Sequence, residues 1–371
     1  MDATFYGTIY LGDLGGEGEP ENYSYENGSG FIPVVDGVDY VCGHETVSMR
    51  IFREVFHPLV YSLVFFLGVA GNGLMMTVLL RRGRLRITEI YLLHLALADL
   101  LLLFTIPFSI VENLAEWVFG EFLCKLVGLL TDLNLLCGSL LLACIGFDRY
   151  LAIVHAIPAM HSRRPKTVHL TCMVLWLFCL GISLPNVVFL SVNGDHPGPR
   201  TCFLHNYGIN AHNWLLTSRF FTHVLCFFLP LAVMSYCYTA VIVTLRHSQK
   251  GQEKQSAIRL ALLVTLVFCL CWLPYNITIT VDTMGSLKVI SNQSCEAAER
   301  LDQAIVVTKS LGVSHCCLNP FLYAFVGVRF RNDLVQLLSK WGCGRVCLPF
   351  ITAQGHARPS VSEGVTTTST I

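Results

Sequence analysis

The sequence predicts an all-α membrane protein: a seven-transmembrane helix bundle with a short amphipathic membrane-surface helix after the seventh span. Hydrophobic residues make up 53% of the 371-residue chain and charged residues only 13%, well below the roughly 25% that is typical of soluble domains. Apolar runs of about 20 residues, the length that crosses roughly 30 Å of hydrocarbon, recur along the chain. Arginine and lysine gather in alternate connecting segments, which is the pattern of a multi-pass protein.

Each span is expected where a long apolar run lies between polar segments. The seven runs cover residues 55–80, 89–114, 121–154, 167–191, 214–245, 256–283 and 302–327. The third and fifth exceed the length that a bilayer requires, so we expect these two helices to tilt or to project beyond the lipid. The chain then divides into an acidic, glycosylated arm (1–54), the seven-helix domain (55–327), the surface helix (328–341) and a Ser/Thr-rich tail (342–371).

The arm is charged in one sense only, because residues 1–49 hold nine Asp and Glu residues and no Lys or Arg. Such an arm attracts a basic partner; a merely solvated disordered tail is the alternative. Tyr25 lies beside Glu26, and Tyr23 lies two residues after Glu21, a setting that suits tyrosine sulfation and ligand contact. Glycosylation sequons are expected to be used at Asn22, Asn27 and Asn292.

Basic residues in the connecting segments predict the orientation. The segments after the first, third and fifth spans contain Arg81, Arg82, Arg84 and Arg86; Arg163, Arg164 and Lys166; and Arg246, Lys250, Lys254 and Arg259. We therefore expect these loops and the tail in the cytoplasm, the N-terminus outside the cell, and the chain in the plasma membrane. No basic segment precedes an early apolar run in MDATFYGTIY, so the first span itself is expected to direct insertion.

Most of the 16 cysteines lie within spans, where cysteine is usually a small apolar core residue. Four face the oxidising exterior, and four cysteines allow three pairings. A closed ring of seven helices favours Cys124 with Cys202 and Cys42 with Cys295, because each pairing ties a loop to a helix that the ring brings near. No histidine cluster of suitable spacing accompanies the other cysteines, so no metal centre is expected.

Polar residues inside the spans are costly in hydrocarbon, so each needs a partner, a cavity or a function. Asp99, Asn134 and Asn319 fall at middle depths of three spans; they could hold a hydrated cation or form a structural hydrogen-bond network, and spacing alone favours neither. Asp148 and Arg149 lie near the inner end of the third span. The pair can neutralise itself in one state and release Arg149 in another, as a switch requires; an inert snorkelling arginine is the alternative.

The segment VRFRNDLVQLLSK after the seventh span reads as an amphipathic helix along the membrane surface. Its apolar face would hold Phe330, Leu334, Leu337 and Leu338. Cys343 and Cys347 follow at once, and they are either palmitoylation sites or plain free thiols. Serines and threonines crowd the last dozen residues, where phosphorylation would create dense negative charge.

Six motifs together resemble the motif set of rhodopsin-like G-protein-coupled receptors: GN in the first span, LALAD in the second, DRYLAIVHA after the third, W with P near the end of the fourth, CWLPYN in the sixth and NPFLY in the seventh. The resemblance covers all seven spans. Within that superfamily, three stretches resemble CXC-type chemokine receptors: WVFGEFLCK, LLLACIGFDRYLAIVHA and HCCLNPFLYAFVGVRFR. The type-3 receptor looks nearest, with types 5, 1 and 2 close behind.

The resemblance implies an activation switch made of Asp148, Arg149, Tyr150, Tyr238, Trp272, Asn319, Pro320 and Tyr323. Tyr238 and Tyr323 would move toward Arg149 on activation. Trp272 would be the toggle under the ligand pocket, and the prolines of the sixth and seventh spans would let those helices bend.

The resemblance also implies an allosteric sodium ion held by Asp99, Asn134 and Asn319. The chain departs from the usual pattern here, because Gly138 stands where many relatives supply a serine hydroxyl. No other cofactor is expected.

The ligand site implied by the resemblance is a wet, acidic cavity at the outer mouth, lined by Glu112, Asp132, Asp282 and Asp302. It would receive the basic amino terminus of a chemokine whose core is captured by the acidic arm. Lys309 lies eleven residues before Pro320, about 16 Å higher along the helix axis, which puts it toward the outer mouth, where it can face a wet cavity. It either contacts the ligand or pairs with Asp132 or Asp302. Many chemokine receptors have a glutamate at the place of Lys309 and a tryptophan at that of Ser109.

The implied function is that of a CXC chemokine receptor, which binds a basic chemokine outside and activates an inhibitory-class heterotrimeric G protein inside, driving calcium signalling and chemotaxis of leukocytes. Receptor kinases and an arrestin would act on the tail, and the terminal Ser369-Thr370-Ile371 fits a PDZ-domain ligand. Membrane lipid would hold the surface helix. The chain is not expected to be an enzyme or to bind nucleic acid.

Two alternatives share the fold. A scavenging receptor would bind chemokine without activating a G protein, but the intact DRYLAIVHA motif argues against it. A retinal photoreceptor needs a seventh-span lysine for its Schiff base. By resemblance to opsins, that lysine would lie one turn nearer the proline than Lys309 does. Val313 occupies that place here.

Overall fold

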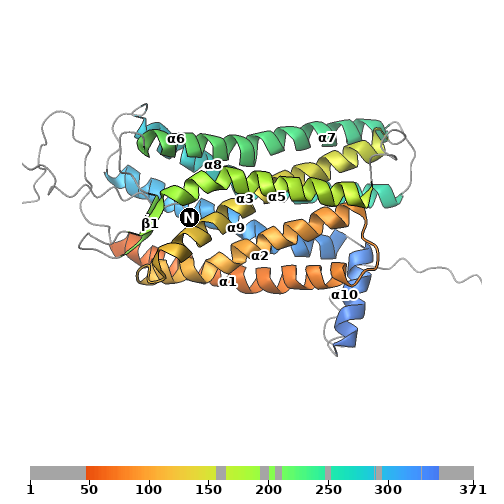
Figure 1. Cartoon of the computed structure of the whole chain (residues 1–371), viewed down its shortest axis with the longest axis horizontal. Helices are drawn as coiled ribbons and strands as arrows, with labels where there is room; N and C mark the ends of the chain where they lie inside the picture. The colour runs from red at the N-terminus through yellow and green to blue at the C-terminus, as the bar shows by residue number, and fades with distance from the viewer. Residues whose placement is uncertain are drawn as a thin grey trace, which may run out of the picture.

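The computed structural model describes residues 47–155, 164–192, 200–204, 211–246, 252–287, 289, 295–326 and 328–341. The long helices among these residues run side by side as one bundle (Figure 1). In chain order the elements are α1 (Val47–Leu80), α2 (Ile87–Leu114), α3 (Gly120–Ile153), α5 (Pro165–Phe189), β1 (Leu190–Val192), β2 (Cys202–Leu204), α6 (Ala211–Thr222), η1 (His223–Phe228), α7 (Leu229–Arg246), α8 (Gln252–Ser286), α9 (Cys295–Val326) and α10 (Val328–Lys340).

The expected spans are all helical, which confirms the predicted fold class. The consecutive segments α6, η1 and α7 form the fifth span, and α8 and α9 are the sixth and seventh. By length and composition, six helices of the described part can cross a membrane, and these are the first six spans. α9 begins at Cys295 rather than at residue 302, because its first turns carry charged residues such as Glu296 and Arg300, which an apolar run excludes. The third span is long, as predicted, with 34 residues.

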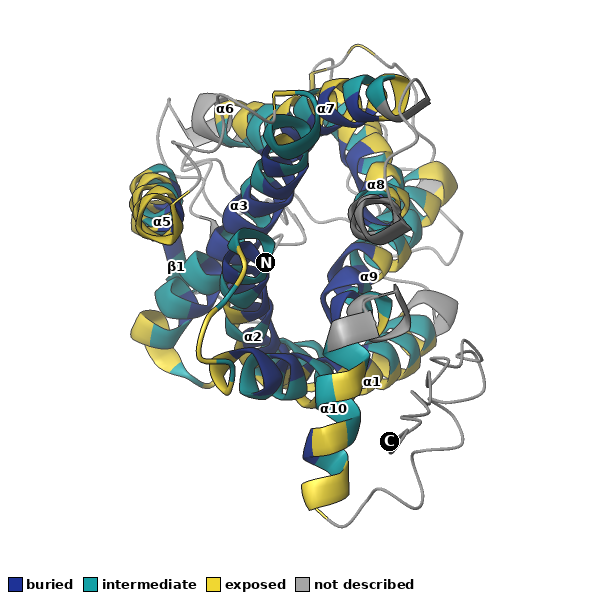
Figure 2. Ribbon diagram, turned by 90° about the vertical axis from the view of Figure 1, so that its right-hand side faces the viewer, coloured by how far each residue is buried: buried dark blue, intermediate teal, exposed yellow. Residues whose placement is uncertain are grey.

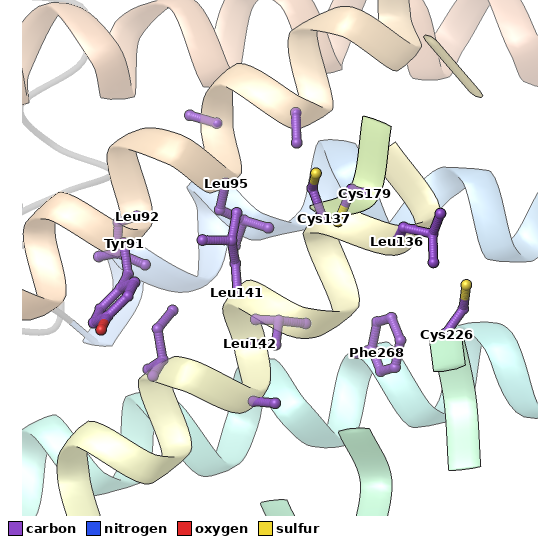
Figure 3. Packing of buried hydrophobic residues seen from close by; sticks show 14 of the residues in the cluster. Tyr91, Leu92, Leu95, Leu136, Cys137, Leu141, Leu142, Cys179, Cys226 and Phe268 are labelled. Atoms are coloured by element: carbon purple, nitrogen blue, oxygen red, sulfur yellow. The ribbon is translucent and has the colours of Figure 1, made fainter. Parts of the chain in front are cut away.

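α3 lies between several neighbours: it packs against α2, α5 and α7. The largest apolar cluster of the described residues includes Leu95 of α2, Leu141 of α3 and Phe268 of α8, and Figure 3 shows Leu95 and Leu141 close together between the helices. Buried residues face the inside of the bundle and exposed ones face outward (Figure 2). Outward apolar side chains such as Leu177, 65% exposed, would be covered by lipid.

Prolines lie inside six of the spans without ending them: Pro58, Pro107, Pro185, Pro230, Pro274 and Pro320. Membrane helices tolerate proline because neighbouring groups and local changes of pitch satisfy the freed backbone atoms. The fifth span contains such a change in η1, a six-residue π-helix. Segments of this kind are frequent at functional sites, and η1 directs His223 toward the sixth span, as described below.

The amphipathic helix predicted after the seventh span is present as α10, and it lies crosswise at the end of α1 (Figures 1 and 2). Its apolar residues are at least partly buried, and Leu337 is 3% exposed. A salt bridge fixes it to the loop between α1 and α2, with Nε of Arg82 2.6 Å from Oδ2 of Asp333. Arg82 also pairs with Glu89 of α2. Two carboxylates from different helices therefore hold one arginine.

Candidate functional site

The two ends of the bundle carry different chemistry. We call the end with the disulfide between Cys124 and Cys202 the disulfide end, and the opposite end, with Asp148 and Arg149, the Arg149 end. The disulfide joins the start of α3 to strand β2, with Cα atoms 5.5 Å apart, which confirms this predicted pairing. Cys42, the predicted partner of Cys295, lies outside the described residues, so that pairing stays a prediction.

The β1–β2 hairpin is tied down at the disulfide end by more than the disulfide. The backbone N–H of Cys202 donates to Oε1 of Glu112 at 2.8 Å. Trp117, 1% exposed, donates its backbone N–H to the carbonyl oxygen of Arg200 at 2.6 Å and its indole N–H to the carbonyl of Gly120 at 2.8 Å. Gly120 has φ +76°, a conformation that a residue with a side chain rarely adopts. Glu112, expected to face a ligand, therefore also positions the hairpin.

Asp132 is held in a polar chain that joins three spans. Its Oδ2 accepts from Nδ2 of Asn186 on α5 at 3.1 Å, and Oδ1 of Asn186 accepts from the hydroxyl of Ser218 on α6 at 2.9 Å. A cavity of about 60 Å³ lies beside the chain, lined by residues of α3, α5, α6 and η1. That volume equals roughly two water molecules, so it has room for one small charged group. The only carboxylate among its described lining residues is that of Asp132.

Asp282 near the end of α8 forms a salt bridge with Arg219 of α6, with Nη1 2.7 Å from Oδ2. The same nitrogen lies 3.2 Å from the hydroxyl of Thr283. This pair ties the fifth span to the sixth at the disulfide end. Asp302 and Lys309 of α9 are half-buried, and both make polar or electrostatic interactions within the protein.

Lys309 lies close enough to Glu112 and to His57 of α1 for its charge to act on both. The structure thus brings the predicted acids and the lysine to one end of the bundle. These acids are not free to bind a ligand, because Glu112, Asp132 and Asp282 each have a hydrogen-bonded partner in the protein. A basic ligand group must displace or share these partners.

Below these acids, Trp272 of α8 packs against α9. Its indole N–H lies 3.2 Å from Nδ1 of His315, and that same nitrogen is 2.8 Å from the carbonyl oxygen of Gly312. An unprotonated Nδ1 accepts from the indole, whereas a protonated Nδ1 donates to the carbonyl, so the two hydrogen bonds exclude each other. Oδ1 of Asn276, one turn above, accepts a hydrogen bond from Nδ1 of His223 on η1 at 2.6 Å.

The position of the Trp272 side chain requires glycine at position 312, because a Cβ at Gly312 would lie 2.8 Å from the indole ring. We expect Gly312→Ala to displace Trp272 and to destabilise the protein by about 1–3 kcal/mol, the usual result of overpacking. Gly181→Ala is the matched control, since nothing lies within 4 Å of the new Cβ and alanine is the better helix former. Thermal unfolding of the detergent-solubilised protein should show a lower Tm for the first variant only. Equal Tm values would contradict the described seating of Trp272.

Asp99 is fully buried at the centre of the bundle and gathers the residues predicted to hold sodium. Its Oδ1 accepts from Nδ2 of Asn134 at 3.2 Å, and its Oδ2 accepts from Nδ2 of Asn319 at 2.9 Å. Both carboxylate oxygens are thus satisfied by neutral donors from α3 and α9. Gly138 adds no hydroxyl, although a Cβ there would have its nearest neighbour, Leu95, at 3.8 Å. The geometry suits a structural network; sodium binding stays a prediction.

Asp148 and Arg149 form a closed ion pair at the Arg149 end. Oδ2 of Asp148 lies 2.6 Å from Nη2 of Arg149, and the same guanidinium nitrogen donates to the hydroxyl of Thr88 on α2. Asp148 is 5% exposed, and Nε of Arg149 is buried without a hydrogen-bond partner among the described residues. The arginine is therefore held inside the protein by α2 and α3, rather than reaching to the headgroups.

Of the three tyrosines of the predicted switch, the structure describes the side chains of two, Tyr238 and Tyr150. Tyr238 of α7, 4% exposed, accepts a hydrogen bond from Thr265 of α8 at 3.4 Å. Tyr150 points elsewhere, with its hydroxyl 2.9 Å from Nε2 of His155. Tyr323 belongs to α9, but its side chain lies outside the described part. Tyr238 thus links the fifth and sixth spans in the state in which Arg149 is paired with Asp148.

Several predicted residues lie outside the described residues. They are Tyr23, Tyr25, the sequons at Asn22, Asn27 and Asn292, and the cysteines Cys343 and Cys347. Their assignments stay predictions.

The sequence analysis missed three residues that the structure places in these networks: Arg219, Asn186 and His315. The sequence contained a signal for Arg219, because an arginine within a predicted span is costly in lipid and therefore needs a partner. His315 carried the same signal in HCCLNP. Asn186 did not, since one asparagine near a span end is unremarkable.

The comparisons with known proteins agree with this architecture. The model of the family "7 transmembrane receptor (rhodopsin family)" matches residues 71–323. The chain is 45% identical over 328 residues to C-X-C chemokine receptor type 5 of Homo sapiens, covering 86% of this chain and 87% of the relative. It is 44% identical over 293 residues to C-X-C chemokine receptor type 3 of Homo sapiens, covering 79% and 78%.

These two identities differ too little to choose between type 5 and type 3, so the expectation that type 3 is nearest stays a prediction. The matches extend across the helices that hold the Asp99 network, the Asp148–Arg149 pair and the disulfide. The chain therefore belongs to the rhodopsin family of G-protein-coupled receptors and, within it, to the C-X-C chemokine receptors.

Proposed function

We propose that this receptor lies in the plasma membrane, binds a basic CXC chemokine at the disulfide end, and activates an inhibitory-class heterotrimeric G protein at the Arg149 end. The observation that carries the proposal is the closed pair of Asp148 and Arg149, held to α2 through Thr88, in a chain similar throughout to chemokine receptors. A G protein would be recruited when Arg149 is released.

The orientation is supported by two features of the sequence and the structure. Disulfides persist in oxidising surroundings, so the end with Cys124 and Cys202 would face outside. Arg84, Arg164 and Lys166 are exposed at the other end, as the positive-inside rule requires of cytoplasmic loops. The arm that precedes α1 would then be extracellular.

Basic groups of the chemokine would bind acidic groups of the receptor, some of which already pair with receptor cations. The acidic arm, with Tyr23 and Tyr25 as sulfation sites, would attract the basic core of the chemokine and raise its association rate. The amino terminus of the chemokine would then reach the acids of the disulfide end. Because Asp282 is already paired with Arg219, a ligand cation must compete with that arginine. Binding energy is thus coupled to the contact between the fifth and sixth spans.

This competition predicts the effect of Arg219→Gln. The variant leaves the Asp282 carboxylate without its internal cation, so we expect a basic CXC chemokine to bind about twofold to fivefold more tightly, the range for a partly exposed ion pair. Arg200→Gln is the matched control: it removes the same charge at the same end, from an exposed arginine paired with Glu116. Radioligand binding to membranes measures both. Equal changes in the two variants would show that only net charge matters.

The signal would pass from the disulfide end through Trp272 and the Asp99 network to Arg149. A ligand moves this equilibrium only by binding the signalling state more tightly. In that state Tyr238 and Tyr323 would approach Arg149, and the end of α8 would move away from it. The Asp99 site, if loaded with sodium, would favour the closed state, because the ion would hold α2, α3 and α9 together.

The segments beyond the described residues would regulate the receptor. We assign receptor-kinase and arrestin binding to the serines and threonines of the tail, palmitoylation to Cys343 and Cys347, and a PDZ-domain partner to Ser369-Thr370-Ile371. Calcium signalling and leukocyte chemotaxis would follow from G-protein activation.

The test is G-protein activation in cells that express this chain, measured across a panel of CXC and CC chemokines. We expect a response to a small group of CXC ligands, which inactivation of inhibitory-class G proteins abolishes. Saturable binding with no G-protein response would make the chain a scavenging receptor. No binding of any chemokine in the panel would overturn the proposed ligand class.

A further inference from the structure

The cavity beside Asp132 is lined by residues of three spans. Among the described residues, its walls come from the third span (α3), the fourth (α5) and the fifth (α6 and η1). Glu112, Asp282 and Lys309, which belong to α2, α8 and α9, are not part of these walls. The cavity is therefore a compartment separate from the charged groups that the second, sixth and seventh spans bring to the disulfide end.

Oxygen atoms from all three spans face this compartment. The hydrogen bonds from Ser218 to Asn186 and from Asn186 to Asp132 fix the positions of these oxygens. They do not saturate them, because a carboxylate accepts about four hydrogen bonds and an amide oxygen about two. The wall also holds Thr222, and within the described part of the chain no hydrogen bond engages its hydroxyl. Acceptors for several N–H groups thus converge on one small space.

The rest of the wall is apolar or weakly polar. It consists of Leu135, Leu136, Ile182, Phe221 and Cys226. A hard metal cation such as Ca²⁺ takes about six to eight oxygen ligands, and the apolar part of this wall offers it none. An alkylammonium ion matches both parts, because its three N–H groups need acceptors and its carbon atoms gain from apolar contacts.

We propose that the cavity binds the primary ammonium group of a small amine, with the Asp132 carboxylate as its main partner. A volume of about 60 Å³ limits the enclosed part of the ligand to about three non-hydrogen atoms. Ligands of that size bind at best in the millimolar range. The same ammonium chemistry is found at the amino terminus of a peptide, but walls made of the third, fourth and fifth spans alone favour a free amine.

The fifth span carries the cavity on one face and its contacts with the sixth span on the adjacent face. Ser218 and Thr222 are four residues apart, and both line the cavity. Arg219 and His223 follow them directly, and both bond to α8. Residues four apart share a helix face, so an ammonium group held by the first pair would fix the rotation of α6 that the second pair requires.

This coupling gives the amine an allosteric effect, which rests on the proposed function. The bound amine would favour the pairing of Arg219 with Asp282, the contact with which a chemokine cation has to compete. A chemokine that is already bound should therefore dissociate faster in the presence of the amine, by about twofold to fivefold. A ligand that merely competed for the same site would leave that dissociation rate unchanged.

The test compares thermal unfolding of the full-length, detergent-solubilised receptor in about 100 mM ethylammonium chloride and in sodium chloride at the same concentration. We expect ethylammonium to raise the Tm by about 2–5 °C. Asp132→Asn keeps an acceptor for Asn186 but removes the charge, so it should lose the shift. Thr222→Val should lose much of it. Glu116→Gln, the matched control, removes a carboxylate paired with Arg200 at the same end and should keep the full shift.

Three results would overturn the inference. A full shift in both Asp132→Asn and Thr222→Val would place the amine elsewhere. An equal shift with tetramethylammonium, which has no N–H group, would mean that no hydrogen-bonded ammonium is recognised. Loss of the shift in the chemokine-bound receptor, with an unchanged chemokine dissociation rate, would assign the cavity to the amino group of the chemokine itself. Because the thermal shift needs no chemokine, it separates failure of this inference from failure of the proposed function.

Discussion

Replacing Arg149 with alanine is expected to abolish chemokine-evoked G-protein activation while leaving chemokine binding in place. The reason is positional: Arg149 lies at the end of the bundle opposite the disulfide, paired with Asp148 and Thr88, and it is the group that we propose is released to the G protein. Nucleotide exchange on the G protein, measured beside chemokine binding in the same membranes, checks the prediction. Arg164→Ala, which removes an exposed arginine from the same end, is the control and should signal normally.

Loss of stability could imitate this result, and the structure offers a way to separate the two. Removing Arg149 leaves the carboxylate of Asp148, 5% exposed, without its cation, and breaking a buried pair in this way costs about 3–5 kcal/mol. The double variant Asp148→Asn with Arg149→Ala should recover much of that stability. It should not recover G-protein activation. A double variant that signals as well as the intact chain would contradict the role of Arg149.

Removing the disulfide with Cys202→Ala should nearly eliminate folded receptor at the cell surface. A native disulfide contributes about 2–5 kcal/mol, and this one closes a loop with a sequence separation of 78. Its loss also frees the hairpin that Glu112 and Trp117 hold through Cys202 and Arg200. Surface staining and chemokine binding measure the effect.

The control for the disulfide is Cys172→Ala, which removes a free, fully buried thiol from α5. It should retain surface expression, because only a small side chain is lost from an apolar core. A Cys202→Ala receptor that reaches the surface and binds chemokine like the intact chain would show that the hairpin is held by its hydrogen bonds alone.

The sequence predicted the spans, the disulfide and the residues that meet around Asp99, because each depends on a local signal. A bilayer requires long apolar runs, and polar residues within them have few ways to be satisfied except by one another. The start of α9 was placed too late for the same reason, since Glu296 and Arg300 extend that helix beyond its apolar part.

The partners of the outer acids could not be predicted, because they depend on how each helix is rotated about its axis. Nothing in the spacing of Glu112 and Cys202 indicates that a backbone N–H would meet that carboxylate. Arg219 and Asp282 lie on different spans, 63 residues apart, and their pairing requires the three-dimensional arrangement of α6 and α8. The predicted acids therefore lie at one end of the bundle, but Glu112, Asp132 and Asp282 already have partners in the protein, and their role as a ligand pocket stays a prediction.

The most direct test of the account measures whether chemokine binding at the disulfide end opens the Arg149 end. Spin labels carried by noncanonical amino acids at Lys166 of α5 and Ser256 of α8, chosen so that the native cysteines stay untouched, report the distance between these helices by electron paramagnetic resonance. We predict a longer distance when an activating CXC chemokine is bound to the intact receptor. An unchanged distance in a receptor that activates its G protein would contradict the proposed release of Arg149.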